Sequence, residues 1–363
     1  MPSIIDLPSI VAGLKEGEKE LLSRFFSVQE SIGKLVLPAE MKPWAEKNFG
    51  NSADVESQRI IKVFNKLTFE TALFNELRAK RPIEAISDED SEKAISNSLG
   101  DPFCKPLTTT PADSFGRVKG RHCITASNVA KYDGLHGLVI FKEHNPLRFS
   151  EKELQDYFNT ALKWFDKANK SNRNAAYPFL LWNCLWRSGA SIIHGHMQLA
   201  LGEGSHYAEA EYYNRLRKEY FAKFNSDYFA DLFKVHQLIG LGFENKKISV
   251  FTNITPRKDK EVTIMSERLD KRFVSILYKI LNCLIKDLGV MSFNLGVILP
   301  PLGKEASDKA GADWKGFPVI TRIVSRGSLS NKTSDIGGVE LYARSNVIET
   351  DPHKVFEKVK SYF

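Results

Sequence analysis

The chain has 363 residues, of which 42% are hydrophobic and 26% charged, so it can bury a core as one large domain or two moderate ones. The formal net charge of +7 comes from Lys and Arg spread along the chain without a basic tract. This distribution disfavours nucleic acid as the partner and is compatible with phosphorylated small molecules. The four cysteines form no CxxC pair, which argues against both a disulfide framework and a thiolate zinc cluster.

Neither the N-terminal stretch nor any apolar segment indicates export or membrane insertion. The opening MPSIIDLPSIVAGLKEGEKE lacks a basic region followed by a long apolar run. Apolar stretches stay below the roughly 20 residues that span a bilayer. We therefore expect a cytoplasmic protein without a membrane partner.

The first 70 residues are amphipathic, and we predict helices for them. The same prediction covers ESQRIIKVFNKLTFETALFNELRAKRP, which ends at Pro82. The acidic, polar segment EAISDEDSEKAISNS, residues 84–98, is typical of a surface loop. A loop here would separate the N-terminal region from the remainder of the chain.

A hairpin, a helix and a second hairpin are predicted next. The turn at Asp133-Gly134 joins an apolar strand to a second strand at 137–141. SEKELQDYFNTALKWFDKANK, residues 150–170, begins with a capping box and repeats apolar residues at helical spacing. FLLWNCLWRSGASIIHGHMQLALG then predicts two strands joined by a turn near Ser188-Gly189.

The same order recurs in the second part of the chain. ISVFTNITPRKDKEVTIMSERL predicts a hairpin, KRFVSILYKILNCLIKDLGV an amphipathic helix, and FNLGVILPP with FPVITRIVS a last pair of strands. In this alignment Asn253 corresponds to Asn128, Asn294 corresponds to Asn183, and PVITRI replaces HGHMQL. The fold class is therefore α+β with an internal duplication.

Two histidines and a glutamine alternate in SIIHGHMQLA. On a strand, side chains two residues apart share a face, so we expect His194, His196 and Gln198 to project to one side. Three interpretations are open: structural histidines, a metal site that His144 or His136 completes, and covalent catalysis. In the last, one imidazole attacks phosphorus while the second imidazole and the amide support the phosphoryl oxygens.

GASIIHGHMQ resembles the signature of galactose-1-phosphate uridylyltransferases, a branch of the histidine-triad superfamily that reads Gly-x-Ser-x-x-His-Pro-His-x-Gln. Gly195 stands where the family has proline. NELRAKRP, SNVAKYDGLHGLVIFKEHNP and GGVELYARSNVIETDP also resemble family segments, the second of them also in diadenosine tetraphosphate phosphorylases. The resemblance implies two hairpin-helix-hairpin motifs in one mainly antiparallel sheet with flanking helices.

The resemblance also implies roles for individual residues. His196 would be the nucleophile, supported by His194, Gln198 and Ser191. The nucleotide and its phosphates would contact Arg78, Arg81, Asn128, Asn183 and Gly189, with Lys131 as a further cation. Glu340 would contact the sugar or acceptor. The corresponding regions are a helical, nucleotide-contacting arm (1–100), a first half with the active site (101–235) and a degenerate second half (236–363).

The family's zinc site uses a CxxC pair and two histidines, of which this chain matches only His144 and His194. We therefore expect no structural metal, or a weakly held zinc on these histidines. The expected function is transfer of a nucleoside monophosphate, through a nucleotidyl-histidine, from a nucleotide sugar to a sugar 1-phosphate or inorganic phosphate. A phosphorylase of dinucleoside polyphosphate or adenylyl sulfate is the alternative, as are a metal-dependent hydrolase using His144, His194 and His196 and a non-catalytic nucleotide-binding protein. A homodimer is also expected.

Overall fold

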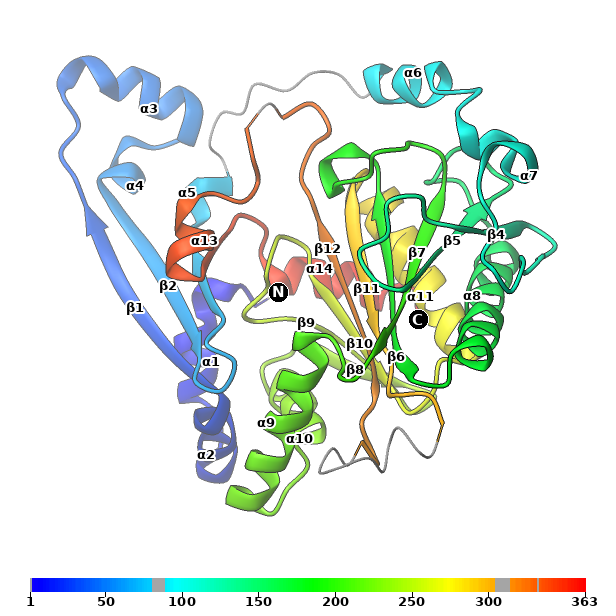
Figure 1. The fold of residues 1–363 in the computed structure, drawn as a ribbon. Coiled ribbons are helices and arrows are strands. Elements are labelled where there is room, and N and C mark those ends of the chain that lie inside the picture. The colour runs from blue at the N-terminus through cyan, green and yellow to red at the C-terminus, as the bar shows by residue number, and fades with distance from the viewer. Residues whose placement is uncertain (1, 80–88, 304–313, 332) are drawn as a thin grey trace.

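The computed structural model describes residues 2–79, 89–303, 314–331 and 333–363, and its main feature is a nine-stranded antiparallel sheet (Figure 1). The strand order is β4-β5-β7-β6-β11-β12-β10-β9-β8. The strands are β4 (Cys123–Ser127), β5 (Leu135–Phe141), β6 (Ala175–Cys184), β7 (His196–Glu203), β8 (Gly242–Asn245), β9 (Ile248–Thr252), β10 (Val262–Ser266), β11 (Phe293–Ile298) and β12 (Val319–Ser325).

A smaller sheet has the order β1-β2-β3-β13, with β13 parallel to β3. Its strands are β1 (Phe26–Lys34), β2 (Ser57–Asn65), β3 (Thr71–Phe74) and β13 (Ser345–Ile348). The helices are α1 (Leu7–Ala12), α2 (Glu16–Phe25), α3 (Lys42–Phe49), α4 (Ser52–Glu56), α5 (Glu76–Ala79), α6 (Glu89–Asn97), α7 (Pro106–Thr109), α8 (Glu151–Ser171), α9 (Ala208–Phe224), α10 (Tyr228–Leu238), α11 (Lys271–Asn282), α13 (Gly338–Ala343) and α14 (Pro352–Lys360). Short turns η1 (Ile4–Asp6), η2 (Ala39–Met41), η3 (Pro102–Cys104), η4 (Trp186–Ser188) and η5 (Cys283–Asp287) connect them.

Helices α8 and α11 cover one face of the large sheet, as predicted. The capping box of Ser150 and Glu153 begins α8, and its buried face packs with the alternate residues Met197, Leu199 and Leu201 of β7. The intervening residues of β7, including His196 and Gln198, therefore face the opposite side. Among the described residues, no helix is both long enough and apolar enough to cross a membrane.

The helices predicted for the first 70 residues and across residues 56–82 are wrong where strands form: residues 26–34, 57–65 and 71–74 are β1, β2 and β3, and residues 80–82 lie outside the described residues. The apolar residues of β2 also fit helical spacing, but Ile60, Ile61 and Val63 are β-branched and favour strands. Pairing with β1, for example Val28 with Val63, decides the outcome. The predicted loop at 84–98 is also wrong from Glu89 onward, where α6 forms.

The duplication is confirmed by the strand registers. Ile140 of β5 pairs with His196 of β7, and Met265 of β10 pairs with Ile320 of β12. His196 and Ile320 are therefore counterparts. In the same way, the amide of Asn128 donates to the His136 carbonyl and the amide of Asn253 to the Glu261 carbonyl, which supports that predicted correspondence.

The predicted correspondence of Asn183 with Asn294 is wrong. Asn183 lies two residues beyond the Leu181–Gln198 pair, opposite His196, whereas Ile298 lies opposite Ile320. Ile298 is thus the counterpart of Asn183. Asn294 instead pairs directly with Asn183 across the central β6–β11 junction, because the two halves meet there in antiparallel orientation.

Candidate active site

The turn between β6 and β7 prepares the site. Leu185 and Gly189 have φ values of 65° and 91°, and η4 lies between them, so the chain reverses tightly before the histidines. Strand β7 begins only at His196, and His194 lies in the bend before it. The prediction of one strand carrying all three side chains is therefore wrong for His194, while His196 and Gln198 share a face.

His196 is buried and held in one tautomer. Its Nδ1 lies 2.8 Å from the carbonyl oxygen of His194. A carbonyl can only accept, so Nδ1 carries the proton and Nε2 keeps its lone pair. Burial lowers the pKa of His196, outweighing the opposing hydrogen bond to His194. The ring is thereby a neutral imidazole with Nε2 as its nucleophilic atom.

Gly195 is explained by close packing. A Cβ at this position would lie 2.4 Å from Cδ2 of Phe141, which occupies the paired position on β5. The amide of Gly195 also donates to the His144 carbonyl at 3.0 Å, a bond that proline could not make. The departure from the family signature therefore has a local reason.

Gln198 is oriented by its neighbours. Its Oε1 lies 3.1 Å from Nε2 of His136 and accepts from the Tyr132 hydroxyl at 3.5 Å. Nε2 of His136 also lies 3.1 Å from Nδ2 of Asn128. Burial lowers the pKa of His136. With Oε1 turned to His136, the amide nitrogen of Gln198 has no partner among the described residues and can donate to a ligand.

The remaining predicted residues of the first half differ in their surroundings. Lys131 donates to Ser127 at 2.7 Å and to the His136 carbonyl at 2.9 Å, so it braces the hairpin. Ser191 and Gly189 are exposed in the turn before His194. Sequence reasoning missed Arg187 in this turn, whose Nε and Nη2 are buried without a partner among the described residues.

A cavity of about 460 Å³ borders Gln198 and Asn183. Tyr132 and Tyr207 line one part of it, and Glu209 of α9 another. This volume lies within the range typical of small-molecule sites. The cavity thus gives the sheet face with His196 and Gln198 room for a ligand.

Four potential metal ligands converge beside His196: Asp101, Cys104, His144 and His194, with ligand atoms all within 4.8 Å of one another. The two Nδ1 atoms of the histidines are 3.0 Å apart, and Cys104 Sγ lies 3.5 and 3.6 Å from them. Asp101 Oδ2 is buried, has no hydrogen-bond partner among the described residues, and lies 3.8 Å from His144 Nδ1. These spacings suit four ligands around one ion.

The proton positions strengthen the fit. His194 Nε2 lies 2.8 Å from the Phe141 carbonyl, and His144 Nε2 lies 3.0 Å from the Ile95 carbonyl. Both Nε2 atoms must donate, so both Nδ1 atoms present lone pairs to each other and to the Asp101 carboxylate. The thiol of Cys104 can supply one proton at most. Two lone pairs and a carboxylate thus face one another, and a bound cation would remove the repulsion between them.

The sequence signal for this cluster was available. Asp101 and Cys104 have the spacing of the family's CxxC pair, with aspartate in place of the first cysteine. A search restricted to cysteine pairs misses it. Asp101 Oδ1 accepts from the amides of Phe103 and Cys104, which fixes η3 in place. Among the described residues, His136 and His196 are not part of the cluster.

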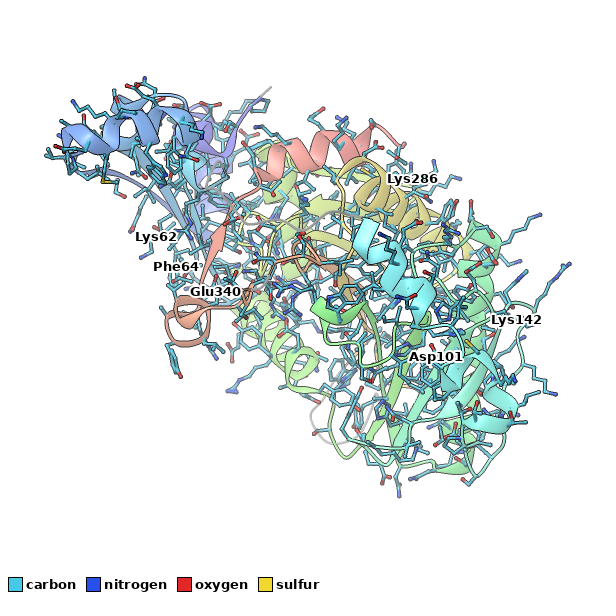
Figure 2. All side chains as sticks on the ribbon, turned by 90° about the horizontal axis from the view of Figure 1, so that it is seen from above. Lys62, Phe64, Asp101, Lys142, Lys286 and Glu340 are labelled. Atoms are coloured by element: carbon cyan, nitrogen blue, oxygen red, sulfur yellow. The ribbon has the colours of Figure 1, made fainter. Side chains whose placement is uncertain are left out.

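Arg78 and Glu340 lie away from the histidines, at the smaller sheet, where α5 and α13 are neighbours (Figure 1). Figure 2 shows Glu340 well separated from Asp101. Glu340 accepts from the Gly337 amide at 2.9 Å and lies 3.5 Å from Lys258 Nζ, and it lines a cavity of about 430 Å³. Nε of Arg78 is buried and has no hydrogen-bond partner in the part of the chain that the structure describes. Arg81 lies outside the described residues. The structure therefore does not bring the predicted acceptor residue to His196 within one chain.

Solved structures resemble this fold over most of their lengths. An ADP-glucose phosphorylase from Arabidopsis thaliana with bound ADP-glucose matches with a TM-score of 0.60 at 16% identity, covering 80% of this chain and 94% of that one. A GalT-like protein from Arabidopsis thaliana gives 0.57 at 14%, covering 72% and 92%. A uridylyltransferase gives 0.54 at 16%, covering 70% and 88%. This chain has the uridylyltransferase fold.

The resemblance seen in the histidine motif thus extends to the architecture. No family model matches the sequence, and no curated protein does. The fold expected from the motif is confirmed, while the chemistry and the substrates stay predictions that the site must support.

Proposed function

We propose that the protein is a nucleotidyltransferase that carries a nucleoside monophosphate on Nε2 of His196. The observation that supports this most directly is the 2.8 Å hydrogen bond from Nδ1 of His196 to the His194 carbonyl. It leaves Nε2 unprotonated, on the sheet face where Gln198 and Asn183 line a cavity with their amide groups.

The proposed reaction has two displacements at one phosphorus. Nε2 of His196 attacks the α-phosphorus of a nucleoside diphosphate compound, and the bond from that phosphorus to the bridging oxygen breaks. The leaving phosphate ester takes the electron pair. A second phosphate then attacks the same phosphorus, the P–N bond breaks, and the imidazole returns to its starting tautomer.

The side chains around His196 suit the charge that develops. The amide nitrogens of Gln198 and Asn183 would donate to the non-bridging oxygens, and the His194 carbonyl would stabilise the imidazole ring as it gains positive charge. Ser191 and Arg187, in the turn before His194, would contact the leaving phosphate. A non-catalytic nucleotide-binding protein would not need the fixed tautomer.

The test is a search for the covalent intermediate. The purified protein is incubated separately with ADP-glucose, UDP-glucose, adenylyl sulfate and diadenosine tetraphosphate, and the intact mass is measured. We expect one donor to add one nucleoside monophosphate, with no adduct in His196→Ala. His122→Ala is the control, because His122 is a half-exposed histidine paired with Glu153 beside α8. Turnover without any adduct in the unmodified protein would contradict the proposal.

A second step on the adduct identifies the acceptor class. The first donor to try is ADP-glucose, because it is the ligand of the Arabidopsis phosphorylase whose structure matches. Adding inorganic phosphate or a sugar 1-phosphate to the isolated adduct distinguishes a phosphorylase from a transferase. The homodimer stays a prediction, which size-exclusion chromatography with light scattering can test by measuring the molar mass in solution.

We further propose that Asp101, Cys104, His144 and His194 hold a divalent cation such as zinc. Such an ion would fix the bend before His196; the closed set of four protein ligands is typical of structural sites and disfavours a metal-dependent hydrolase. One equivalent of metal is expected in the purified protein and little in Cys104→Ala. The buried Cys184→Ala is the control, and equal metal content in both variants would contradict the assignment.

A further inference from the structure

A chain of hydrogen bonds runs from the second half of the protein into the candidate active site. Asp335 accepts from Nε and Nη2 of Arg326 at 2.6 and 2.9 Å. Nη1 of Arg326 donates to Oδ1 of Asn294 at 2.6 Å. Nδ2 of Asn294 then donates to Oδ1 of Asn183 at 2.7 Å and to the Ser188 carbonyl at 2.9 Å.

The chemistry of the partners fixes each amide orientation. A guanidinium can only donate, so the atom of Asn294 that faces Arg326 must be the carbonyl oxygen. The Ser188 carbonyl can only accept, so the atom that faces it must be the amide nitrogen. That nitrogen in turn requires the carbonyl oxygen of Asn183 to face Asn294. The orientation of Asn183 is therefore dictated by Arg326, two residues away in the chain of bonds.

From this geometry we infer that Asn294 and Arg326 are positioning residues that hold the Asn183 amide nitrogen toward the transferred phosphoryl group. The inference rests on the proposed function. Extending the β6–β7 register two residues past the Leu181–Gln198 pair places Asn183 across from His196, and Asn183 lines the cavity of about 460 Å³. Its nitrogen has no partner among the described residues. Were the amide reversed, its oxygen would face the negatively charged phosphoryl group and oppose the transition state.

Arg326 is suited to hold another residue and not to bind substrate. Its three described hydrogen bonds use Nε, Nη1 and Nη2, and the bidentate pair with Asp335 holds the guanidinium plane in place. Asp335 is itself fixed, because Lys258 Nζ donates to its backbone carbonyl. Arg326 lowers the pKa of Asp335 against the opposing effect of burial, so the carboxylate stays charged. The second half, which has PVITRI where the first half has HGHMQL, thereby contributes to the first half's site.

The test compares single and double variants in single-turnover formation of the nucleotidyl adduct. We expect Asn183→Ala to slow adduct formation about 100-fold, as loss of one donor to a developing charge typically does. Asn294→Ala should slow it at least 10-fold. In the Asn183→Ala background, adding Asn294→Ala should slow adduct formation much less than it does in the unmodified protein, because the part of its effect that passes through Asn183 is already lost. Independent losses that multiply would overturn the inference.

Asn294→Asp provides a second variant that keeps the side-chain shape. Its carboxylate still accepts from Arg326 but places an oxygen against Asn183, so the Asn183 amide reverses and kcat falls while KM changes little. An unchanged rate for this variant would also overturn the inference. Arg272→Ala is the control for Arg326→Ala, because Nε and Nη2 of Arg272 both donate to Oδ2 of Asp270 at the start of α11. Arg326→Ala should slow the adduct at least 10-fold, and Arg272→Ala should not.

The outcomes separate this inference from the function on which it rests. If the unmodified protein forms no adduct with any donor, the proposed function and the positioning role both fall. If the unmodified protein forms the adduct and Asn294→Asp forms it equally fast, only the positioning role falls. Thermal unfolding of each variant shows that the altered rates belong to folded protein.

Discussion

Equivalent positions in the two halves of the large sheet hold neutral polar side chains in the first half and mostly charged ones in the second. In the first half, Asn128, His136 and Gln198 form a chain of neutral polar groups. At the equivalent positions of the second half stand Asn253, Glu261 and Arg322. There Nδ2 of Asn253 donates to Glu261 at 3.3 Å, and Arg322 Nε donates to Glu261 at 2.6 Å.

The second-half row is part of a wider ionic cluster. Arg322 Nη1 also donates to Glu70, which follows β2, at 2.9 Å and to the Tyr213 hydroxyl at 3.0 Å. Burial raises the pKa of Glu70, but Arg322 and Arg257 outweigh it, so its pKa lies below the ordinary value. Glu70 belongs to the smaller-sheet region, so this cluster ties the two sheets together.

The difference teaches where ligand-binding capacity resides. In the first half, the amide nitrogen of Gln198 has no partner among the described residues and can bind a ligand. In the second half, the charged groups of Arg322 and Glu261 bind each other. The two halves also differ in the sizes of the residues that lie opposite each other on neighbouring strands. Phe141 lies opposite Gly195 in the first half, and Ser266 lies opposite Val319 in the second. Each half thus fills the same space with a different partner.

The largest effect is expected from Arg322→Leu. Removing this cation leaves the buried Glu261 without a charged partner among the described residues and leaves Glu70 paired with Arg257 alone, which should lower the free energy of unfolding by about 3–5 kcal/mol. Gln198→Leu, at the equivalent position, should cost less than about 1.5 kcal/mol because no charge is uncovered. Urea unfolding of both variants measures the contrast. Similar losses in the two variants would mean that the halves are not chemically distinct.

An intermediate effect is expected from Gly195→Ala. The added methyl group meets the ring of Phe141, and such overpacking typically costs about 1–3 kcal/mol. Val319→Ala, at the equivalent position of the second half, removes volume beside the small Ser266 and should move no histidine. Adduct formation should therefore slow in Gly195→Ala and persist in Val319→Ala. Unfolding curves and single-turnover rates check both expectations.

The smallest effect is expected in how the free energy of unfolding of Glu70→Gln changes with pH. Because its folded pKa is lowered, the Glu70 carboxylate stabilises the fold above its ordinary pKa of 4.5, and this contribution disappears as the pH falls through the folded pKa. The stability difference between the unmodified protein and Glu70→Gln should therefore shrink in acid. Glu20→Gln is the control, since Glu20 makes only an exposed pair with Arg24. A difference that stays constant with pH would contradict a charged Glu70.

The parts of the structure that the sequence predicted are those with local signals. The capping box of α8, the hairpin turn at Asp133-Gly134 and the duplication all depend on neighbouring residues, and the structure confirms them. Strand β2 was mistaken for a helix because its spacing fits both periods, and only its pairing with β1 decides. Contacts between segments far apart in the sequence, such as the pairing of β1 with β2, cannot be predicted from local sequence patterns.

The candidate site shows the same division. The histidine motif indicates His196 and Gln198 but gives no signal for Asp101, because a pattern of cysteine pairs does not include a carboxylate. The chain from Asp335 to Asn183 spans more than 150 residues of sequence and exists only because β6 and β11 are adjacent. Arg78 and Glu340 were grouped with the histidines by resemblance, and the structure places them at the other sheet.

The bond from His144 to the Ile95 carbonyl has a consequence for helix α6. The same imidazole that would coordinate a cation through Nδ1 anchors this short helix through Nε2. An ion bound at this cluster and helix α6 would therefore both be held by the His144 imidazole. If an ion is bound, amide hydrogen exchange across α6 should accelerate when a chelator removes it. The exchange rate of this helix would then report how much of the protein holds metal.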